Sequence, residues 1–281
     1  MKVISTEYSQ ILGARISQRL GVGLVDVKFS KFPDGELYLR TGALDEEMVI
    51  VGSVTGSDAL VQLLLLIDAC SESDNRLVIP YMGYARQDKQ FLPGEPLSAR
   101  AIARTVAHNV TGIYTVNIHD ENVLRHFGLP TTNSSLGNDV ADYLKSEFTD
   151  PIILAPDDGA RYFAEQIAGS GDWEFDQLEK TRISGESVRM DQKDLRTKGR
   201  DVVIVDDIIS TGGTIAAAAE MLYEQGAKSV HAACVHGVFT GGAYTHLAAA
   251  GIQSVICSDT IERACSHVSA AVIVSKALSE C

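Results

Sequence analysis

The sequence predicts an α/β protein with mainly parallel sheets flanked by helices, arranged as two tandem domains. Three observations support this fold class. Short apolar runs rich in β-branched residues alternate with amphipathic segments of helix length, as in buried parallel strands joined by helices. A stretch of the first half resembles a stretch of the second. Finally, 281 residues, of which 45% are hydrophobic and 22% charged, suffice for two cores of ordinary globular composition.

Seven apolar runs are predicted to be strands, because each is short and bounded by Gly, Pro, Asn or Asp. In chain order they are MVIVGSV (48–54), RLVIPYM (76–82), GIYTVNI (112–118), PIILAP (151–156), DVVIVDD (201–207), SVHAACVHGVF (229–239) and SVICSD (254–259). Helical periodicity lies between them and is clearest over 58–73 and 215–226. Gly226 suits the position just after the second helix.

The internal repeat relates residues 49–82 to residues 203–235, each being a strand, a loop rich in Gly, Ser and Thr, a helix and a strand. Two αβ units also share composition by chance, and that alternative stays open. Where the first copy has Gly52 and Ser53, the second has two acids, so we expect that only the second loop kept ligand chemistry. The expected domains are 1–141, with the degenerate loop, and 142–281, whose last residues are free to pack back on the first domain.

Composition narrows the functional classes. A net charge of -13 argues against a nucleic-acid partner, because a phosphate backbone would be repelled. The N-terminus has no apolar signal core and the longest apolar run, 63–67, is too short for a bilayer, so we expect a cytoplasmic protein without a membrane partner. Five cysteines without a Cys-x-x-Cys pair predict free thiols, with neither a disulfide framework nor a thiolate zinc site.

The stretch GRDVVIVDDIISTGGT (199–214) is the most informative one. Ligands of open parallel sheets bind beyond the carboxyl ends of the strands, where Asp206 and Asp207 are expected. Adjacent carboxylates suit vicinal sugar hydroxyls, or Mg²⁺ reached through water. Residues 210–214 offer hydroxyls and bare backbone N–H groups before a helix, which suits a phosphate. This spacing fits a ribose 5-phosphate. A capped loop that binds nothing would explain the glycines, but not two consecutive acids.

The segment VVIVDDIISTGGT resembles the PRPP-binding loop of type I phosphoribosyltransferases and of ribose-phosphate pyrophosphokinases (PRPP synthetases). KFPDGE (31–36) and YMGYARQDKQFLPGEPLSAR (81–100) resemble segments specific to the pyrophosphokinases. NIHD (117–120), APDDGA (155–160) and EKTR (179–182) follow in the family's order, so the resemblance covers nearly the whole chain. It implies two phosphoribosyltransferase-type domains and is closest to the compact archaeal form of the family.

The resemblance also implies roles for residues whose function the sequence alone does not indicate. A Pro-Asp-Gly turn, a polar loop, a lone histidine and scattered cations are all common as purely structural features. Phe32 would stack on the adenine of ATP while Asp34 and Glu36 meet its exocyclic nitrogen, reaching in from a neighbouring subunit. This implies a homo-oligomer of at least two subunits. The other implied residues are Arg86, Gln87, Asp88 and His119 for ATP, His119 and Asp157 for metal, Lys180 and Arg182 for catalysis, and Asp206, Asp207, Ser210, Thr211, Gly212, Gly213 and Thr214 for ribose 5-phosphate.

The implied reaction is diphosphoryl transfer from Mg-ATP to ribose 5-phosphate. Two positions depart from the family pattern: Asn117 stands where Asp is common, and Ser210 stands where many members have Asp. A serine hydroxyl still donates to phosphate but cannot act as a carboxylate. Alternatives are a phosphoribosyltransferase, a non-catalytic relative, or a PRPP-sensing regulator. The first does not need the FPDGE and YARQD segments, the second would lose the loop chemistry, and the third needs a basic DNA-reading module that the sequence lacks.

Overall fold

The structure, a computed structural model, describes residues 1–178, 180–182, 188–190 and 195–280. The chain divides into two compact units. Unit 1 comprises Met1–Ser135, Asp259–Glu262 and Ser269–Cys281, and unit 2 comprises Leu136–Ser258 and Arg263–Val268.

The elements alternate along the chain as the sequence pattern predicts. Those of unit 1 are β1 (Lys2–Ser5), η1 (Glu7–Ser9), α1 (Gln10–Leu20), β2 (Gly23–Leu24), β3 (Val27–Lys31), β4 (Leu37–Thr41), β5 (Glu47–Val51), α2 (Ser57–Ala69), β6 (Asp74–Ile79), α3 (Ser98–Val106), β7 (Gly112–Val116), η2 (Glu121–His126), β8 (Thr131–Ser134) and α8 (Ala271–Ser279). Those of unit 2 are α4 (Gly137–Glu147), β9 (Ile152–Ala155), α5 (Arg161–Gly171), β10 (Phe175–Gln177), β11 (Lys180–Arg182), β12 (Val188–Met190), β13 (Asp201–Ile209), α6 (Gly213–Glu224), β14 (Ser229–Gly237), α7 (Ala243–Ala249), β15 (Ile252–Ser258) and β16 (Ser266–Val268).

The division between the units falls between Ser135 and Leu136, ahead of the expected boundary at residues 141 and 142. The reason is helix α4, which packs against α5 and therefore belongs to unit 2. The C-terminal helix α8 returns to unit 1 and packs on α1, next to β7 and β8.

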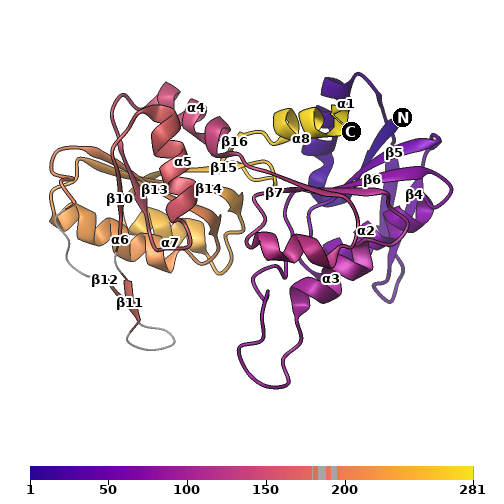
Figure 1. Ribbon diagram of the computed structural model, residues 1–281, viewed down its shortest axis with the longest axis horizontal. Helices are drawn as coiled ribbons and strands as arrows, with labels where there is room; N and C mark the ends of the chain where they lie inside the picture. Colours follow the sequence, from indigo (N-terminus) through magenta and orange to yellow (C-terminus); the bar gives the residue numbers. More distant parts are fainter. Residues whose placement is uncertain (179, 183–187, 191–194, 281) are drawn as a thin grey trace. The chain divides into compact units, whose positions relative to one another are not determined.

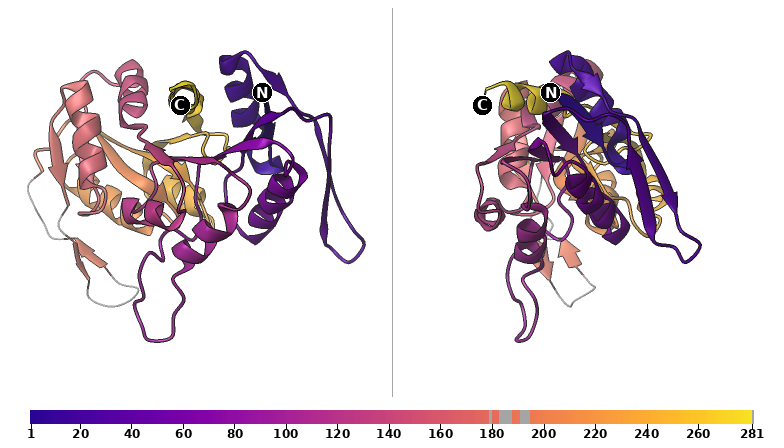
Figure 2. Two further views of the ribbon diagram at one scale, coloured as in Figure 1. Left: turned by 45° about the vertical axis from the view of Figure 1, so that its right-hand side comes forward. Right: turned by 90° about the vertical axis from the view of Figure 1, so that its right-hand side faces the viewer.

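Each unit contains one six-stranded parallel sheet, and the two sheets have the same strand order. The order is β2-β1-β5-β6-β7-β8 in unit 1 and β10-β9-β13-β14-β15-β16 in unit 2. Figure 1 labels many of these strands on the ribbon. In both units an antiparallel hairpin is inserted in the chain between two strands of the sheet. The hairpin β3–β4 lies between β2 and β5 in unit 1, and β11–β12 lies between β10 and β13 in unit 2. The β3–β4 hairpin projects from the rest of its unit (Figure 2). The shared order agrees with the internal repeat.

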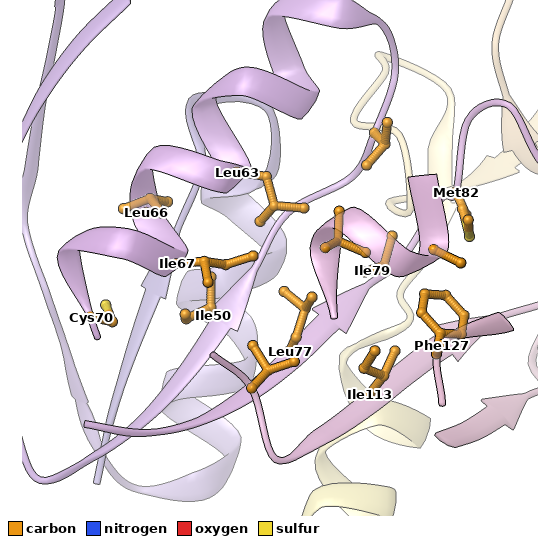
Figure 3. Packing of buried hydrophobic residues seen from close by; sticks show 14 of the residues in the cluster. Ile50, Leu63, Leu66, Ile67, Cys70, Leu77, Ile79, Met82, Ile113 and Phe127 are labelled. Atoms are coloured by element: carbon orange, nitrogen blue, oxygen red, sulfur yellow. The ribbon is translucent and has the colours of Figure 1, made fainter. Parts of the chain in front are cut away.

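The core of unit 1 shows why its helices form where they do. Leu63, Leu66 and Ile67 follow the spacing of helix turns and put one face of α2 on the sheet. That face packs on Ile50 and Leu77, which are register partners on β5 and β6 (Figure 3). All five side chains are buried, and each contributes about 1.5–3 kcal/mol through removal of apolar surface from water.

Helix α6 covers the unit 2 sheet in the corresponding position, with Ala218, Ala219 and Leu222 buried. It ends as predicted, because Gly226 has φ +86° just after the helix and the N–H of Ala227 donates to the carbonyl oxygen of Leu222 (3.0 Å). No helix within the described ranges is long and apolar enough to span a membrane. Cys70, Cys234, Cys257 and Cys265 are free thiols, as the sequence predicts, and Cys281 lies outside the described residues.

Candidate active site

Strand β13 carries the two acids inside the sheet rather than after it. The sequence places them at the strand's end, but β13 keeps its register with β14 as far as Ile209, which pairs with Gly237. Its pairing with β9 stops earlier, at Ile204. Asp206 and Asp207 therefore lie on a stretch of β13 that has a partner strand on one side only, at the carboxyl edge where ligands of parallel sheets bind.

The electrostatics of Asp206 are those of a crowded anionic site. Its pKa is raised well above the ordinary carboxyl range, first by burial and then by the charge and side-chain hydrogen bond of Asp207, with a further contribution from the charge of Asp157. One Asp206 oxygen accepts the N–H of Asp207 at 2.8 Å. The structure thus brings three predicted site residues together, and a cation or several hydroxyl donors would relieve their mutual repulsion.

Asp157 is positioned by the turn between β9 and α5. Its Oδ1 accepts the backbone N–H groups of Gly159 (3.1 Å) and Ala160 (3.4 Å), which fixes the carboxylate just beyond the end of β9. Because β9 pairs with β13, this carboxylate lies at the same edge of the sheet as the two acids of β13.

The residues after β13 form a tight turn into α6. Gly212 has φ +76°, a left-handed conformation, and a Cβ there would stand 3.0 Å from Cγ of Leu247. A Cβ at Gly213, by contrast, would meet nothing within 4 Å, so the space in front of α6 is open. Helix α6 begins at Gly213, and the N-terminus of a helix suits an anion.

The rim of this turn is fixed by the loop after β14. The carbonyl oxygen of Ser210 accepts the N–H of Thr240 at 3.1 Å, and the two hydroxyls are 3.3 Å apart. The Ser210 hydroxyl is therefore held beside the turn into α6, and the Thr211 hydroxyl is the next one along the chain. The predicted loop of residues 210–214 is present as one continuous structure.

Lys180 and Arg182 lie in strand β11, which pairs antiparallel with β12 so that Lys180 faces Met190 and Arg182 faces Val188. Their side chains, and the rest of the segment between 183 and 187, fall outside the described residues.

In unit 1, the FPDGE segment is the turn of the β3–β4 hairpin. The N–H of Phe32 donates to the carbonyl oxygen of Glu36 (2.8 Å), and that of Glu36 to Asp34 Oδ1 (3.3 Å). Gly35 has φ +96°, which explains the glycine. Phe32 is half exposed and packs edge-on against Tyr38, with 5.5 Å between ring centroids. An aromatic face and two acidic side chains are thus displayed together at the tip.

Arg86, Gln87 and Asp88 lie in the loop that leads to α3. Gln87 is the fixed member, because its carbonyl oxygen accepts the N–H of Ala99 (3.2 Å) and its side chain accepts the hydroxyl of Ser98. Arg86 is exposed. The exposed cation of Arg86 therefore lies next to a residue, Gln87, that is held in place by the start of α3.

Asp120 connects Asp88 with His119, and sequence reasoning missed it. Its pKa is lowered, mainly by the backbone N–H of Asn122, and further by hydrogen bonds with the Asn122 side chain and Asp88 and by the charge of His119. One Asp120 oxygen accepts that N–H at 2.7 Å. The available signal was the acid that follows His119 directly in the NIHD motif.

The fit of a metal can be judged from these donors. Across the described residues, no group of three or more His, Cys, Asp or Glu side chains is already arranged around a metal position. His119 and Asp157, both implied as metal ligands, belong to different units. The carboxylates of Asp157, Asp206 and Asp207 nevertheless fit Mg²⁺, which keeps several waters and shares its coordination with phosphate oxygens. Their excess negative charge, visible in the pKa of Asp206, is the supporting observation.

Comparisons with known proteins agree with this geometry. Residues 1–109 match the N-terminal domain of ribose phosphate pyrophosphokinase, and residues 132–269 match the phosphoribosyl transferase domain. The chain is 44% identical over 282 residues to the ribose-phosphate pyrophosphokinase of Methanosarcina acetivorans, covering 99% of both proteins. It is 39% identical over 286 residues to that of Methanopyrus kandleri, covering 99% of this chain and 98% of the relative.

Among solved structures, the phosphoribosylpyrophosphate synthetase of Mycobacterium smegmatis superposes with a TM-score of 0.85 at 26% identity, over 99% of this chain and 97% of that one. The fold is of the α/β class with two parallel six-stranded sheets flanked by helices, in which ligands bind at the carboxyl edge of the sheet. Within that class, the chain belongs to the ribose-phosphate pyrophosphokinase family. The family, fold and enzyme class expected from the sequence are confirmed, including the similarity to archaeal members.

Proposed function

We propose that this chain transfers the β,γ-diphosphoryl group of Mg-ATP to the C1 hydroxyl of ribose 5-phosphate, giving PRPP and AMP. Full-length similarity to ribose-phosphate pyrophosphokinases carries the proposal. PRPP synthesis for nucleotide biosynthesis is the activity of this family. The residue roles below are the finer part of the proposal.

Ribose 5-phosphate occupies the carboxyl edge of the unit 2 sheet. The carboxylates of Asp206 and Asp207 accept its ring hydroxyls, and the turn from Ser210 to Thr214 receives the 5-phosphate. Two observations support this pose: the burial of Asp206 beside the charges of Asp207 and Asp157, which together raise its pKa, and the open space in front of Gly213. The acid pair and the anion site lie on one continuous segment, as the two ends of a sugar phosphate require.

Residues of unit 1 bind ATP. The exposed Phe32 ring stacks on adenine, and Asp34 and Glu36 accept its exocyclic amino group. Arg86 gives the triphosphate a planar cation, with Asp88 and His119 nearby. Asp120 interacts with Asp88 through a hydrogen bond and with the charge of His119, so we assign it the positioning of both side chains.

The reaction is an in-line displacement. The C1 hydroxyl loses its proton to solvent as its oxygen forms a bond to the β-phosphorus. The bond from that phosphorus to the oxygen it shares with the α-phosphate breaks, and AMP leaves with that oxygen. Lys180 and Arg182 stabilise the charge that builds on the bridging and equatorial oxygens, the kind of contribution that dominates phosphoryl transfer. Mg²⁺, when bound, offsets the repulsion between the two anionic substrates. Asp157, Asp206 and Asp207 are the side chains that would hold it.

The test is product analysis with purified protein, ATP, ribose 5-phosphate and Mg²⁺, separating AMP, ADP and PRPP. AMP and PRPP in equal amounts are expected. ADP without PRPP would mean ordinary phosphoryl transfer and would refute the proposal. PRPP consumption with a nucleobase, releasing pyrophosphate, would identify a phosphoribosyltransferase instead.

The adenine site is completed by a second subunit. The β3–β4 hairpin projects from its unit and displays Phe32 at its tip, which suits insertion into a neighbour. Mixing inactive Phe32→Ala and Arg182→Ala proteins tests this, because a shared site regenerates one intact pair in each mixed dimer. Recovery of about a quarter of wild-type activity is expected for random dimers. No recovery after subunit exchange, verified by mass, would place the hairpin in its own subunit's site.

A further inference from the structure

Two cysteines of unit 2 lie in contact outside the site described above. Cys257 is near the end of β15, and Cys265 directly precedes β16. Their Sγ atoms are 3.5 Å apart, and the N–H of Cys257 donates to the carbonyl oxygen of Cys265 (3.0 Å). The parallel ladder of β15 and β16, in which Cys257 pairs with Ser266, holds the thiols against each other. A short sideways movement of either side chain would suffice for a disulfide.

The two thiols are chemically different. The pKa of Cys265 is lowered to about 7, chiefly by the hydrogen bond between its thiol and that of Cys257, with a smaller contribution from Arg263. The pKa of Cys257 is raised by the same hydrogen bond, by burial and by the neighbouring Cys234. Cys265 keeps 8% of its surface exposed, whereas Cys257 keeps none. Cys265 is thus both the better nucleophile and the one that a small reagent reaches.

We propose that Cys257 and Cys265 form a reversible dithiol–disulfide site that responds to hydroperoxides. The thiolate of Cys265 attacks the terminal oxygen of the peroxide; the O–O bond breaks, hydroxide or alkoxide leaves, and the sulfur becomes a sulfenic acid. The sulfur of Cys257 then attacks that of Cys265, its proton goes to the departing oxygen, and water leaves. Two electrons have passed from the thiols to the peroxide. A small dithiol reverses the reaction by thiol–disulfide exchange.

The location gives the site a structural consequence. Residues Asp259–Glu262, between the two cysteines, make their contacts in unit 1. Asp259 pairs with Arg15 (2.6 Å), and the Glu262 carboxylate accepts the N–H of Leu12 (2.9 Å). A disulfide would close a short loop around this segment and restrict it at both points where the chain passes between the units.

The experiment treats the full chain with hydrogen peroxide and maps peptides by mass spectrometry, before and after dithiothreitol. A Cys257–Cys265 cross-linked peptide that lacks two hydrogen atoms and disappears on reduction is expected. Hydrogen–deuterium exchange of residues 258–264 should slow in the oxidised protein. An unchanged rate would refute the restriction of this segment, and peroxide treatment that leaves both thiols reduced, or takes Cys265 to sulfinic acid without a cross-link, would refute the site.

Variants divide the two steps. In Cys257→Ser protein the sulfenic acid cannot be resolved, so dimedone should label Cys265 selectively, and Cys265→Ser should abolish both labelling and cross-link. Cys70→Ser, in unit 1, is the matched control and should cross-link like the wild type. The wild-type peptide map decides the question even if a Cys257 variant fails to fold. A cross-link joining Cys234 instead would move the site and overturn the assignment.

Discussion

The two units share a frame and differ in what that frame holds. Strand order is identical, and each sheet has a hairpin inserted at the same place. In unit 1 the loop after the third strand is closed by packing. Ser53 is fully buried, its hydroxyl donates to the carbonyl oxygen of Thr260, and it accepts the N–H of Tyr81 (3.2 Å). A Cβ on Gly52 would come within 2.7 Å of Leu63.

In unit 2 the same loop is open and acidic. Asp206 and Asp207 replace the glycine and the buried serine, and the turn before α6 leaves space in front of Gly213. The inserted hairpins differ in a parallel way: β3–β4 displays an aromatic ring and two acids, and β11–β12 carries the lysine and arginine of the EKTR motif. The comparison teaches that one repeated frame can carry a closed loop in one copy and an open, acidic loop in the other, through changes that include one loop and one insertion.

The largest expected effect tests the unit 2 hairpin. Replacing Arg182 or Lys180 by Ala should lower kcat by at least about 1,000-fold while ribose 5-phosphate binding stays nearly intact, because these cations act on charge that develops only in the transition state. Steady-state kinetics and calorimetry give both values. The control is Lys228→Ala, which removes an exposed ion pair with Asp201 in the same unit and should change kcat by less than about twofold. An unchanged kcat in both hairpin variants would remove them from the mechanism.

The next effect concerns the acid pair. Asp207→Ala should weaken ribose 5-phosphate binding about 100-fold, since a charged acceptor of sugar hydroxyls is lost. Binding of Mg²⁺ should weaken with it, and calorimetry with and without the metal separates the two. Asp201→Asn, at the opposite end of β13, is the control and should bind both normally. Normal affinities in the Asp207 variant would refute the diol site.

Gly212 and Gly213, in the turn into α6, are expected to differ in their effects: one on folding stability, the other on ligand binding. Gly213→Ala should raise the KM for ribose 5-phosphate about tenfold through crowding of the phosphate, with unchanged folding stability, because its Cβ points into open space. Gly212→Ala should instead cost about 1–2 kcal/mol of stability, from its left-handed φ and its approach to Leu247. Urea titration measures stability, and equal losses in the two variants would contradict this division.

The raised pKa of Asp206 predicts that this ionised carboxylate lowers the folding stability of the unliganded protein. An acid whose folded pKa lies above its unfolded value leaves stability intact below the unfolded pKa and lowers it as pH rises toward the folded pKa. Asp206→Asn should therefore stabilise the unliganded protein at pH 7 by about 1–2 kcal/mol, and the gain should vanish near pH 4. Thermal melts across pH provide the measurement. A gain that is independent of pH would point to packing instead of charge.

Whether a feature of the fold or the site can be predicted from the sequence depends on whether local residues or distant contacts determine it. The seven apolar runs and the end of α6 at Gly226 are local signals, and the structure confirms them. The continuation of β13 to Ile209, past the two acids, is seen only from its pairing with β14. Asp120 was missed because one of the two residues it interacts with, Asp88, is distant in the chain. The joint position of Asp157 and Asp206 depends on the pairing of β9 with β13, which only the structure shows.

The smallest expected effect on catalysis tests whether the unit 1 loop has become purely structural. Ser53→Ala removes a donor to Thr260 and an acceptor for Tyr81 inside a packed core, so it should cost about 1 kcal/mol of stability. It should leave kcat and both KM values unchanged, because that loop no longer has room for a ligand. Stability from urea titration and kinetics on the same preparation decide this. A raised KM for either substrate with normal stability would show that the closed loop still belongs to a binding site, and that the two halves diverged less than their packing indicates.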